Sequence, residues 1–173
     1  MKIRENLSPH CDERRPGSVI DTLVIHSMYD GQSGKAEPLE CIEALRRHEV
    51  SAHYIIDRLG SVWRLVPDEK RAWHAGKSEM PDGRTEVNHF SIGVELLALD
   101  NEVFTDSQYE ALTNLANDLS ARLPLKLVVS HEGIARPVGR KKDPGPLFDW
   151  QRLKALFKKK SHAAALQFPQ YGA

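Results

Sequence analysis

Apolar residues recur along this chain with two periods, one typical of strands and one typical of helices. Helical spacing begins after Pro38, after Thr105 and after Asp149, and each of these three residues is common at a helix start. Short apolar runs typical of strands occupy residues 22–27, 52–57, 62–66, 91–97 and 125–129. Because strands and helices alternate, the pattern predicts a single three-layer α/β domain, with a mixed central sheet of about five strands flanked by helices.

The predicted second helix has the clearest signals of the three. Thr105 and Gln108 form a capping-box pattern, which stabilises the first turn of a helix. The following apolar residues fall on one helical face and are expected to be buried: Tyr109, Leu112, Leu115, Ala116 and Leu119.

The ends of the chain and one long connection lack such periodicity. Residues 1–20 are polar and are expected to form an extended lead-in within a domain that spans residues 1–158. Residues 159–173 are basic and then Ala-rich, and we expect a flexible tail there. Residues 67–89 are polar and turn-rich, and an irregular connection of this length in a small domain is often functional.

Charge and composition exclude several classes of partner. The 173-residue chain has 24 Lys and Arg against 24 Asp and Glu, so its formal net charge of zero gives no reason to expect nucleic acid as a partner. No apolar run reaches transmembrane length, and the charged N-terminus lacks the apolar core of a secretory signal, so we expect no membrane insertion. Cys11 and Cys41 show no metal-binding spacing; reduced thiols are expected, and a single disulfide is left open.

Two of the predicted strands end in the same way, LVIHS at His26 and LVVSH at His131. If these strands lie parallel and adjacent, both histidines emerge at the carboxyl edge of the sheet, where α/β proteins usually bind ligands. Asp143 follows twelve residues after His131, between a basic segment and Pro-Gly-Pro. Two histidines and a carboxylate with one open position are a typical catalytic zinc set, although any one of these histidines alone is better explained by a structural hydrogen bond.

Further charged residues are candidates for catalysis. Strand alternation places Glu95 on the same face as Gly93, where a carboxylate could act as a general base; a solvent-exposed charge on an edge strand is an equally good interpretation. Lys141 and Lys142 precede Asp143, and one of them could stabilise an oxyanion, although on chemistry alone a solvated basic loop is the better explanation.

Three residues in or near the long polar connection could bind substrate. Trp73 and His74, in the segment AWHAG, combine a stacking surface with a hydrogen-bonding ring, although a tryptophan is more often part of a core. Asn88 precedes the strand at residues 91–97 and could border the same cleft.

Six short motifs, in this order, resemble one known family: VIHS, SAHY, AWHAG, N-x-x-SIGVEL, SHEGIA and GRKKDPGP. They are similar to those of the type 2 zinc N-acetylmuramoyl-L-alanine amidases, over residues 8–150. The resemblance implies one zinc ion per chain, held by His26, His131 and Asp143. It also implies hydrolysis of the amide between the lactyl group of N-acetylmuramic acid and L-alanine of the peptidoglycan stem peptide.

The resemblance also distinguishes among the catalytic candidates. It assigns active-site roles to Glu95 and, of the two lysines, to Lys141. Some relatives carry a catalytic tyrosine at the position of Ala52, so this chain resembles the branch in which the glutamate takes that role. That branch contains the anhydro-muropeptide amidases of cell-wall recycling.

The substrate is therefore expected to be a muropeptide, and the chain a cytoplasmic monomer. Two alternatives are left open by the sequence. One is a phage or secreted autolysin that acts on intact wall, in the periplasm or outside the cell if a leader has been removed. The other is a peptidoglycan-binding module without catalysis, against which the complete set of metal ligands argues.

Overall fold

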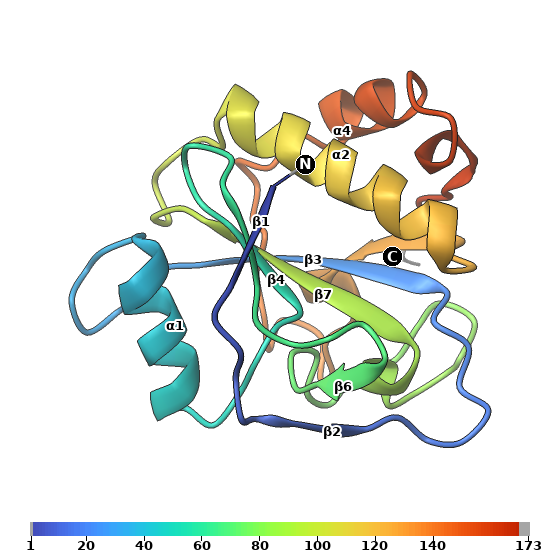
Figure 1. The fold of residues 1–173 in the computed structure, drawn as a ribbon, viewed down its shortest axis with the longest axis horizontal. Helices are drawn as coiled ribbons and strands as arrows, with labels where there is room; N and C mark the ends of the chain where they lie inside the picture. Colours follow the sequence, from blue (N-terminus) through green and yellow to red (C-terminus); the bar gives the residue numbers. More distant parts are fainter. Residues whose placement is uncertain (1, 170–173) are drawn as a thin grey trace.

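The computed structural model describes residues 2–169, and a six-stranded mixed sheet runs through its centre (Figure 1). The strand order is β1–β5–β4–β7–β3–β8, and within this sheet the β4–β5 hairpin is antiparallel while the other neighbours are parallel. The predicted α/β fold with a mixed sheet is confirmed. The strands are β1 (Ile3–Glu5), β3 (Thr22–Met28), β4 (Tyr54–Ile56), β5 (Val62–Arg64), β7 (Ser91–Leu97) and β8 (Leu127–Ser130).

The two longest strands, β3 and β7, are covered on both faces, which explains their nearly continuous apolar sequences. Their side chains alternate between two different environments. Leu23 and Ile25 of β3 pack in the main core with the helices α2 (Asp106–Arg122) and α4 (Trp150–Phe157). Val24, between them, points to the opposite face, where it packs with residues of the long connection and of β8. That opposite face carries the site described below.

The opposite face of the sheet is covered in two parts. Helix α1 (Pro38–Arg47) packs its Cys41, Ile42 and Leu45 against β4 and β7. The long connection and the short helix α3 (His131–Ile134) cover the neighbouring part. The sheet therefore lies between two layers, as predicted.

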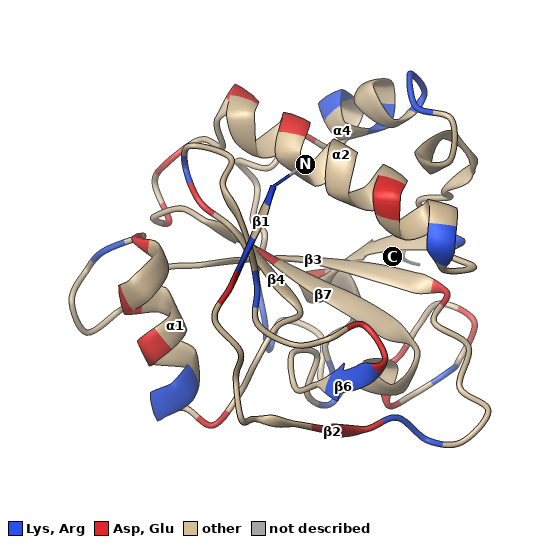
Figure 2. Ribbon diagram, viewed as in Figure 1, with Lys and Arg blue, Asp and Glu red and all other residues tan. Residues whose placement is uncertain are grey.

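The helices begin where the sequence signals place them. The Thr105 side chain accepts from the Gln108 backbone N–H and the Gln108 side chain accepts from the Thr105 N–H, so the predicted capping box is confirmed. The Asp149 carboxylate caps α4 by accepting from the Arg152 N–H. Pro38 is the first residue of α1. Acidic residues lie in the first turn and basic residues in the last turn of α1 and α2, as the helix dipole favours (Figure 2).

The lead-in is more structured than its composition indicates. β1 pairs in parallel with β5 and adds the sixth strand to the sheet. β2 (Cys11–Glu13) pairs antiparallel with β6 (Lys70–Ala72), a strand inside the connection that was expected to be irregular. The same connection ends in the 3-10 helix η1 (Val87–His89). The sequence did not indicate β1, β2 and β6 because two of the three residues in each are charged, so they lack the apolar runs that indicated β4 and β5.

The C-terminal boundary also differs from the expected one. After α4, the 3-10 helix η2 (Ala163–Ala165) returns the chain to the domain, and Ala163 and Leu166 are buried in the main core. Gln167 accepts a backbone hydrogen bond from Val128 of β8. The segment expected to be a flexible tail is thus packed as far as the structure describes it; residues 170–173 lie outside the described part.

Two further expectations concern the cysteines and membranes. Cys11 and Cys41 are both free thiols, and Cys41 is fully buried in the core. Across residues 2–169, the helices are too short or too polar to cross a bilayer.

Arg14, directly after β2, ties the lead-in to the segments around the sheet. Its guanidinium group donates to the backbone carbonyl groups of Asp68, Asn88, His89 and Ser91 at 2.9–3.1 Å. Burial lowers the pKa of Arg14 to about 10, so the group remains charged at neutral pH. One side chain thus joins three separate segments of the chain.

Replacing Arg14 tests whether the lead-in belongs to the folded domain. We expect Arg14→Met to lower the free energy of unfolding by about 2–4 kcal/mol, because several half-buried carbonyl groups lose a charged donor. The neighbouring Arg15→Met is the matched control: Arg15 makes an exposed ion pair with Glu86, worth about 0–1 kcal/mol. Urea unfolding of both variants measures the difference. Equal stabilities would show that the lead-in contributes little.

Candidate metal site and catalytic centre

The metal-ligand candidates meet at the carboxyl ends of neighbouring parallel strands. β3 pairs with β8 in parallel, with Ile25 opposite Ser130, so the residues that follow, His26 and His131, emerge side by side. Ser130 caps the short helix α3 by accepting from the Gly133 N–H, and His131 is its first residue. This turn of helix, which the sequence did not indicate, directs the His131 ring back toward β3.

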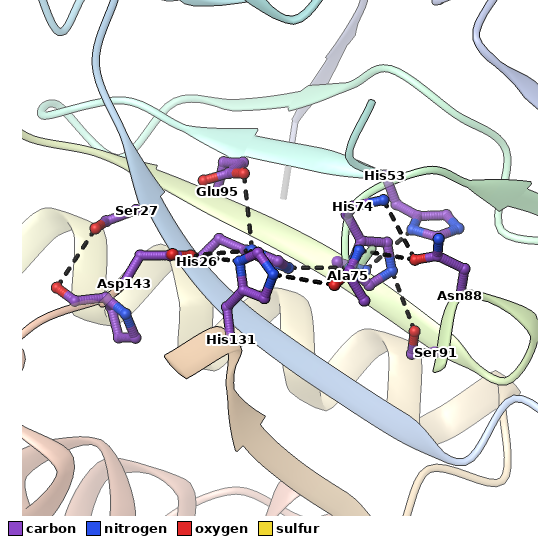
Figure 3. Close-up of polar contacts among 12 residues, drawn as sticks. His26, Ser27, His53, His74, Ala75, Asn88, Ser91, Glu95, His131 and Asp143 are labelled. Atoms are coloured by element: carbon purple, nitrogen blue, oxygen red, sulfur yellow. Dashed lines mark hydrogen bonds and ion pairs between the residues drawn. The ribbon is translucent and has the colours of Figure 1, made fainter. Parts of the chain in front are cut away.

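Asp143 reaches the two histidines from the loop that follows α3. Its backbone carbonyl accepts from the Glu132 N–H at 2.9 Å, and the next carbonyl, of Pro144, accepts from the Ser27 hydroxyl at 3.4 Å. The loop is therefore held at both α3 and the end of β3. Its carboxylate is half-buried and points toward the histidine pair (Figure 3).

The three ligand atoms lie close enough to share one metal ion. His26 Nδ1 lies 3.0 Å from His131 Nδ1 and 3.2 Å from Asp143 Oδ2, and His131 Nδ1 lies 2.9 Å from Asp143 Oδ2. The outer nitrogen of His131, Nε2, lies 3.2 Å from the Ala75 carbonyl, which can only accept, so that nitrogen carries the proton. The Nδ1 lone pair of His131 consequently points into the cluster, as metal binding requires.

Protonation also suits a metal ligand set. Burial, together with the neighbouring His131, lowers the pKa of His26 to about 4, so this ring is neutral at neutral pH. Burial by itself would raise the pKa of Asp143, but its close contacts with His131 and His26 hold it below the usual range. One neutral imidazole and one ionised carboxylate are thus available without further proton loss. The residues present fit a divalent cation.

Glu95 lies beside this cluster, on the strand next to β3. It is opposite His26 in the β3–β7 pair, and its Oε1 lies 3.9 Å from His26 Nδ1. The carboxyl group is only 8% exposed and its Oε2 has no hydrogen-bond partner among the described residues. Burial, reinforced by the negative charge of Asp143, raises the pKa of Glu95 well above its usual value, and Lys141 opposes this shift. The interpretation of Glu95 as an edge-strand charge in solvent is wrong, because β7 lies in the middle of the sheet.

The two lysines before Asp143 differ in their surroundings. Both are exposed, but the positive charge of Lys141 lowers the pKa values of Glu95 and His26, which places it near the cluster. Lys142 instead lines a cavity of about 480 Å³, together with Asp143 itself. This cavity lies between the end of β7 and the loop of Asp143, and it opens beside the metal-ligand candidates.

The three candidate substrate-binding residues lie on the other side of His26. His74 Nδ1 lies 3.0 Å from His26 Nε2 (Figure 3), and the Asn88 side-chain oxygen accepts from the backbone N–H groups of His74 and Ala75. Trp73 is half-buried, and its backbone N–H donates to the Ser51 hydroxyl. In the structure these residues hold the connection against the sheet; contact with substrate stays a prediction for all three.

Gly93 and Ser91 of β7 have roles that the sequence did not reveal. Alternation on β7 is as predicted, since Ile92 and Val94 face the main core while Gly93 and Glu95 face the site. The space above Gly93 is occupied by the His74 ring: a Cβ at position 93 would lie 2.5 Å from that ring. The Ser91 hydroxyl lies 3.1 Å from His74 Nε2. A strand serine carries no signal of such a contact, because the partner is distant in the sequence.

Comparisons with known proteins agree with this geometry. A family model described as N-acetylmuramoyl-L-alanine amidase matches residues 16–146. The chain is 38% identical, over 173 aligned residues, to the 1,6-anhydro-N-acetylmuramyl-L-alanine amidase AmpD of Citrobacter freundii, and the match covers 90% of each chain.

Solved structures show the same fold. The crystal structure of a selenomethionine AmpD derivative superposes with a TM-score of 0.73 at 38% identity, covering 89% of this chain and 93% of that one. The amidase AmiD from E. coli, in complex with the substrate anhydro-N-acetylmuramic acid-L-Ala-D-gamma-Glu-L-Lys, superposes with a TM-score of 0.66 at 33% identity, covering 83% of this chain and 60% of that one. The chain therefore belongs to the N-acetylmuramoyl-L-alanine amidase family, as its sequence motifs predict, and it is an enzyme of that class.

Proposed function

We propose that this chain is a zinc-dependent amidase that hydrolyses the bond between the lactyl group of N-acetylmuramic acid and L-alanine of the stem peptide. The observation that carries the zinc proposal is the convergence of His26, His131 and Asp143 ligand atoms at 2.9–3.2 Å from one another. Two imidazoles and one carboxylate that leave a coordination position open are typical of catalytic zinc. When bound, zinc lowers the pKa of a water ligand to about 7 and polarises the scissile carbonyl group.

Glu95 is proposed as the general base and acid. Its Oε1 lies 3.9 Å from His26 Nδ1, and its Oε2 has no hydrogen-bond partner among the described residues, so the carboxyl group is available for proton transfer beside the ligand cluster. Glu95 takes a proton from the attacking water and then transfers a proton to the departing amine of L-alanine. A buried carboxylate is suited to holding that proton between the two steps.

Lys141 is proposed to stabilise the negative charge that develops on the carbonyl oxygen in the transition state. Its positive charge acts on Glu95 and His26 in the structure, whereas Lys142 faces the neighbouring cavity. A fixed positive charge near the developing oxyanion lowers the barrier without taking part in proton transfer.

The substrate is proposed to be an anhydro-muropeptide, in cell-wall recycling. The AmpD relative is named for the 1,6-anhydro sugar, and the structure of AmiD contains an anhydro-muramyl peptide. The cavity beside Asp143 is proposed to receive part of this substrate. Trp73, outside that cavity, is proposed as a sugar contact. Contact of His74 and Asn88 with substrate also stays a prediction, and their hydrogen bonds within the protein are proposed to hold the site. A cytoplasmic location and a monomeric state stay predictions from the sequence.

Metal removal tests the proposal as a whole. We expect about one zinc ion per chain in the purified protein, by the usual stoichiometry of such sites. A strong chelator is expected to abolish amide cleavage, and added zinc to restore it. Elemental analysis and product chromatography measure both quantities. A protein that binds muropeptides but never cleaves them would instead be the non-catalytic binding module.

The substitution Glu95→Gln tests the proton-transfer role. We expect the variant to retain its zinc and to lose about 10²–10⁴-fold in kcat, because the amide keeps the shape of the side chain but cannot accept the proton. Glu110→Gln, an exposed position on α2, is the control and is expected to behave as wild type. Full zinc content combined with near-normal turnover would remove Glu95 from the mechanism.

The two adjacent lysines provide a matched pair. We expect Lys141→Met to lower kcat by about 10²–10³-fold, as for loss of other oxyanion-stabilising groups. Lys142→Met is expected to leave kcat nearly unchanged and to change KM instead, because that side chain lines the cavity proposed to receive substrate and does not face the ligand cluster. Steady-state kinetics on a soluble muropeptide distinguishes them. An equal loss in both variants would point to general positive charge in the loop.

Product analysis decides between the recycling and wall-degrading settings. Mass spectrometry of digests is expected to show rapid release of the stem peptide from soluble anhydro-muropeptides and little release from intact sacculi. Comparable release from sacculi would favour an autolysin.

A further inference from the structure

A chain of three hydrogen bonds lies behind His26, on the side away from the ligand cluster. His26 Nε2 lies 3.0 Å from His74 Nδ1, and His74 Nε2 lies 3.1 Å from the Ser91 hydroxyl (Figure 3). That hydroxyl donates to the Val87 carbonyl at 2.7 Å. Ser91 and Val87 are fully buried. The donor and acceptor of each hydrogen bond can be assigned in turn, starting at the Val87 carbonyl and ending at His26.

The direction of each bond follows from the one before it. The Val87 carbonyl can only accept, so it takes the single proton of the Ser91 hydroxyl. The hydroxyl oxygen then has only lone pairs to offer, so His74 Nε2 must carry the proton that it receives. A neutral imidazole has one N–H, so His74 Nδ1 is bare and accepts from His26 Nε2. His26 thereby holds its proton on Nε2, and its Nδ1 lone pair points into the cluster.

We propose that His74 and Ser91 are positioning residues that fix His26 in the tautomer whose Nδ1 lone pair faces the metal; the purpose of this tautomer rests on the proposed zinc function. Without them, the His26 proton could move to Nδ1, where it would occupy the place of the ion. Hydrogen-bond partners of metal-ligating histidines generally fix the tautomer and orientation of the ring. Here the partner is a second histidine, whose own tautomer is set by a serine.

Residues 74 and 75 together serve both histidine ligands. The His74 ring accepts from His26, and the Ala75 carbonyl faces His131 Nε2 at 3.2 Å. The Asn88 side chain holds this pair in place through the two backbone N–H groups, at 3.2 and 2.8 Å. Two consecutive residues of the AWHAG segment thus present the outer acceptors for both ligands.

Gly93 supplies the space that the hydrogen-bonded chain from His26 through His74 to Ser91 needs. The His74 ring lies directly over this residue of β7, and a Cβ there would approach the ring to 2.5 Å. The Gly93 N–H is itself held by the Nδ1 of buried His53, at 3.0 Å. The bare backbone under the ring is therefore part of the same arrangement, since any larger residue must displace His74.

Two substitutions of His74 separate the hydrogen bond from the bulk of the ring. His74→Phe keeps a ring but removes the acceptor, whereas the side-chain oxygen of His74→Asn can accept from His26 at the position of Nδ1. Imidazole ¹⁵N NMR of the metal-free protein reports which nitrogen of His26 carries the proton, and competition with a chromophoric chelator reports zinc affinity. Both readouts are independent of catalysis.

In the wild type we expect the His26 proton on Nε2. In His74→Phe we expect signal from the Nδ1–H form and zinc binding weaker by about 10- to 100-fold, the usual effect of losing such a partner. His74→Asn is expected to restore the wild-type tautomer and most of the affinity. Ser91→Ala is expected to shift the His26 tautomer although Ser91 does not touch His26. The control Thr113→Val removes a buried hydroxyl that donates to Tyr109 in α2, and is expected to change neither readout.

Each failure has a distinct meaning. A wild-type His26 protonated on Nδ1 would overturn the proposed positioning role of His74 and Ser91. So would an unchanged His26 tautomer and zinc affinity in both His74→Phe and Ser91→Ala. If the wild type binds no zinc, the proposed zinc function fails, while the NMR of the metal-free protein still decides the tautomer. If His74→Phe does not fold, Ser91→Ala and Gly93→Ala, which displaces the ring, give the same decision.

Discussion

Two imidazole nitrogens and a carboxylate oxygen lie only 2.9–3.2 Å from one another at the centre of this site. Lone pairs at this separation repel unless a proton or a cation lies between them, so the arrangement persists only if the surrounding structure holds each group in place. Burial increases the need to hold each group in place, because a poorly solvated polar group has few alternative hydrogen-bond partners. The remaining features of the fold can be understood as the means by which these atoms are held together.

The parallel pairing of β3 with both β7 and β8 provides the first of these means. It sets the end of β3 beside the end of β8, and it sets His26 opposite Glu95. The turn of helix α3 and the loop of Asp143 are then joined by the bond from the Glu132 N–H to the Asp143 carbonyl. The three proposed ligands, from distant segments of the chain, therefore reach one point through strand pairing and a backbone hydrogen bond.

The long connection between β5 and β7 supplies the second means, and it forms part of the layer over the site face of the sheet. Asn88 holds the backbone of residues 74 and 75, and those residues provide acceptors for the outer nitrogens of His26 and His131. Arg14 ties the same region to the lead-in by bonding to the carbonyl groups of Asn88, His89 and Ser91. A connection with little regular structure is thus firmly held, which explains how it can orient the proposed metal ligands. The length of this connection in the sequence indicated a functional role, but not that the role would be to orient His26 and His131.

Local sequence determined many of the strands and helices of this protein and its candidate site residues. Periodic apolar residues specify β3, β7, α2 and α4, because burial of one face requires a regular spacing of apolar residues in the sequence. The ligand and catalytic candidates could be proposed from residue type and from motifs near strand ends. The tertiary structure alone decided what depends on residues distant along the chain: that β7 is central and Glu95 buried, that the lead-in and the residues after α4 pack into the domain, and that His74 lies over Gly93 behind His26. Such facts leave no local pattern, because a hydrogen bond or a buried carboxylate depends on which segment folds against it.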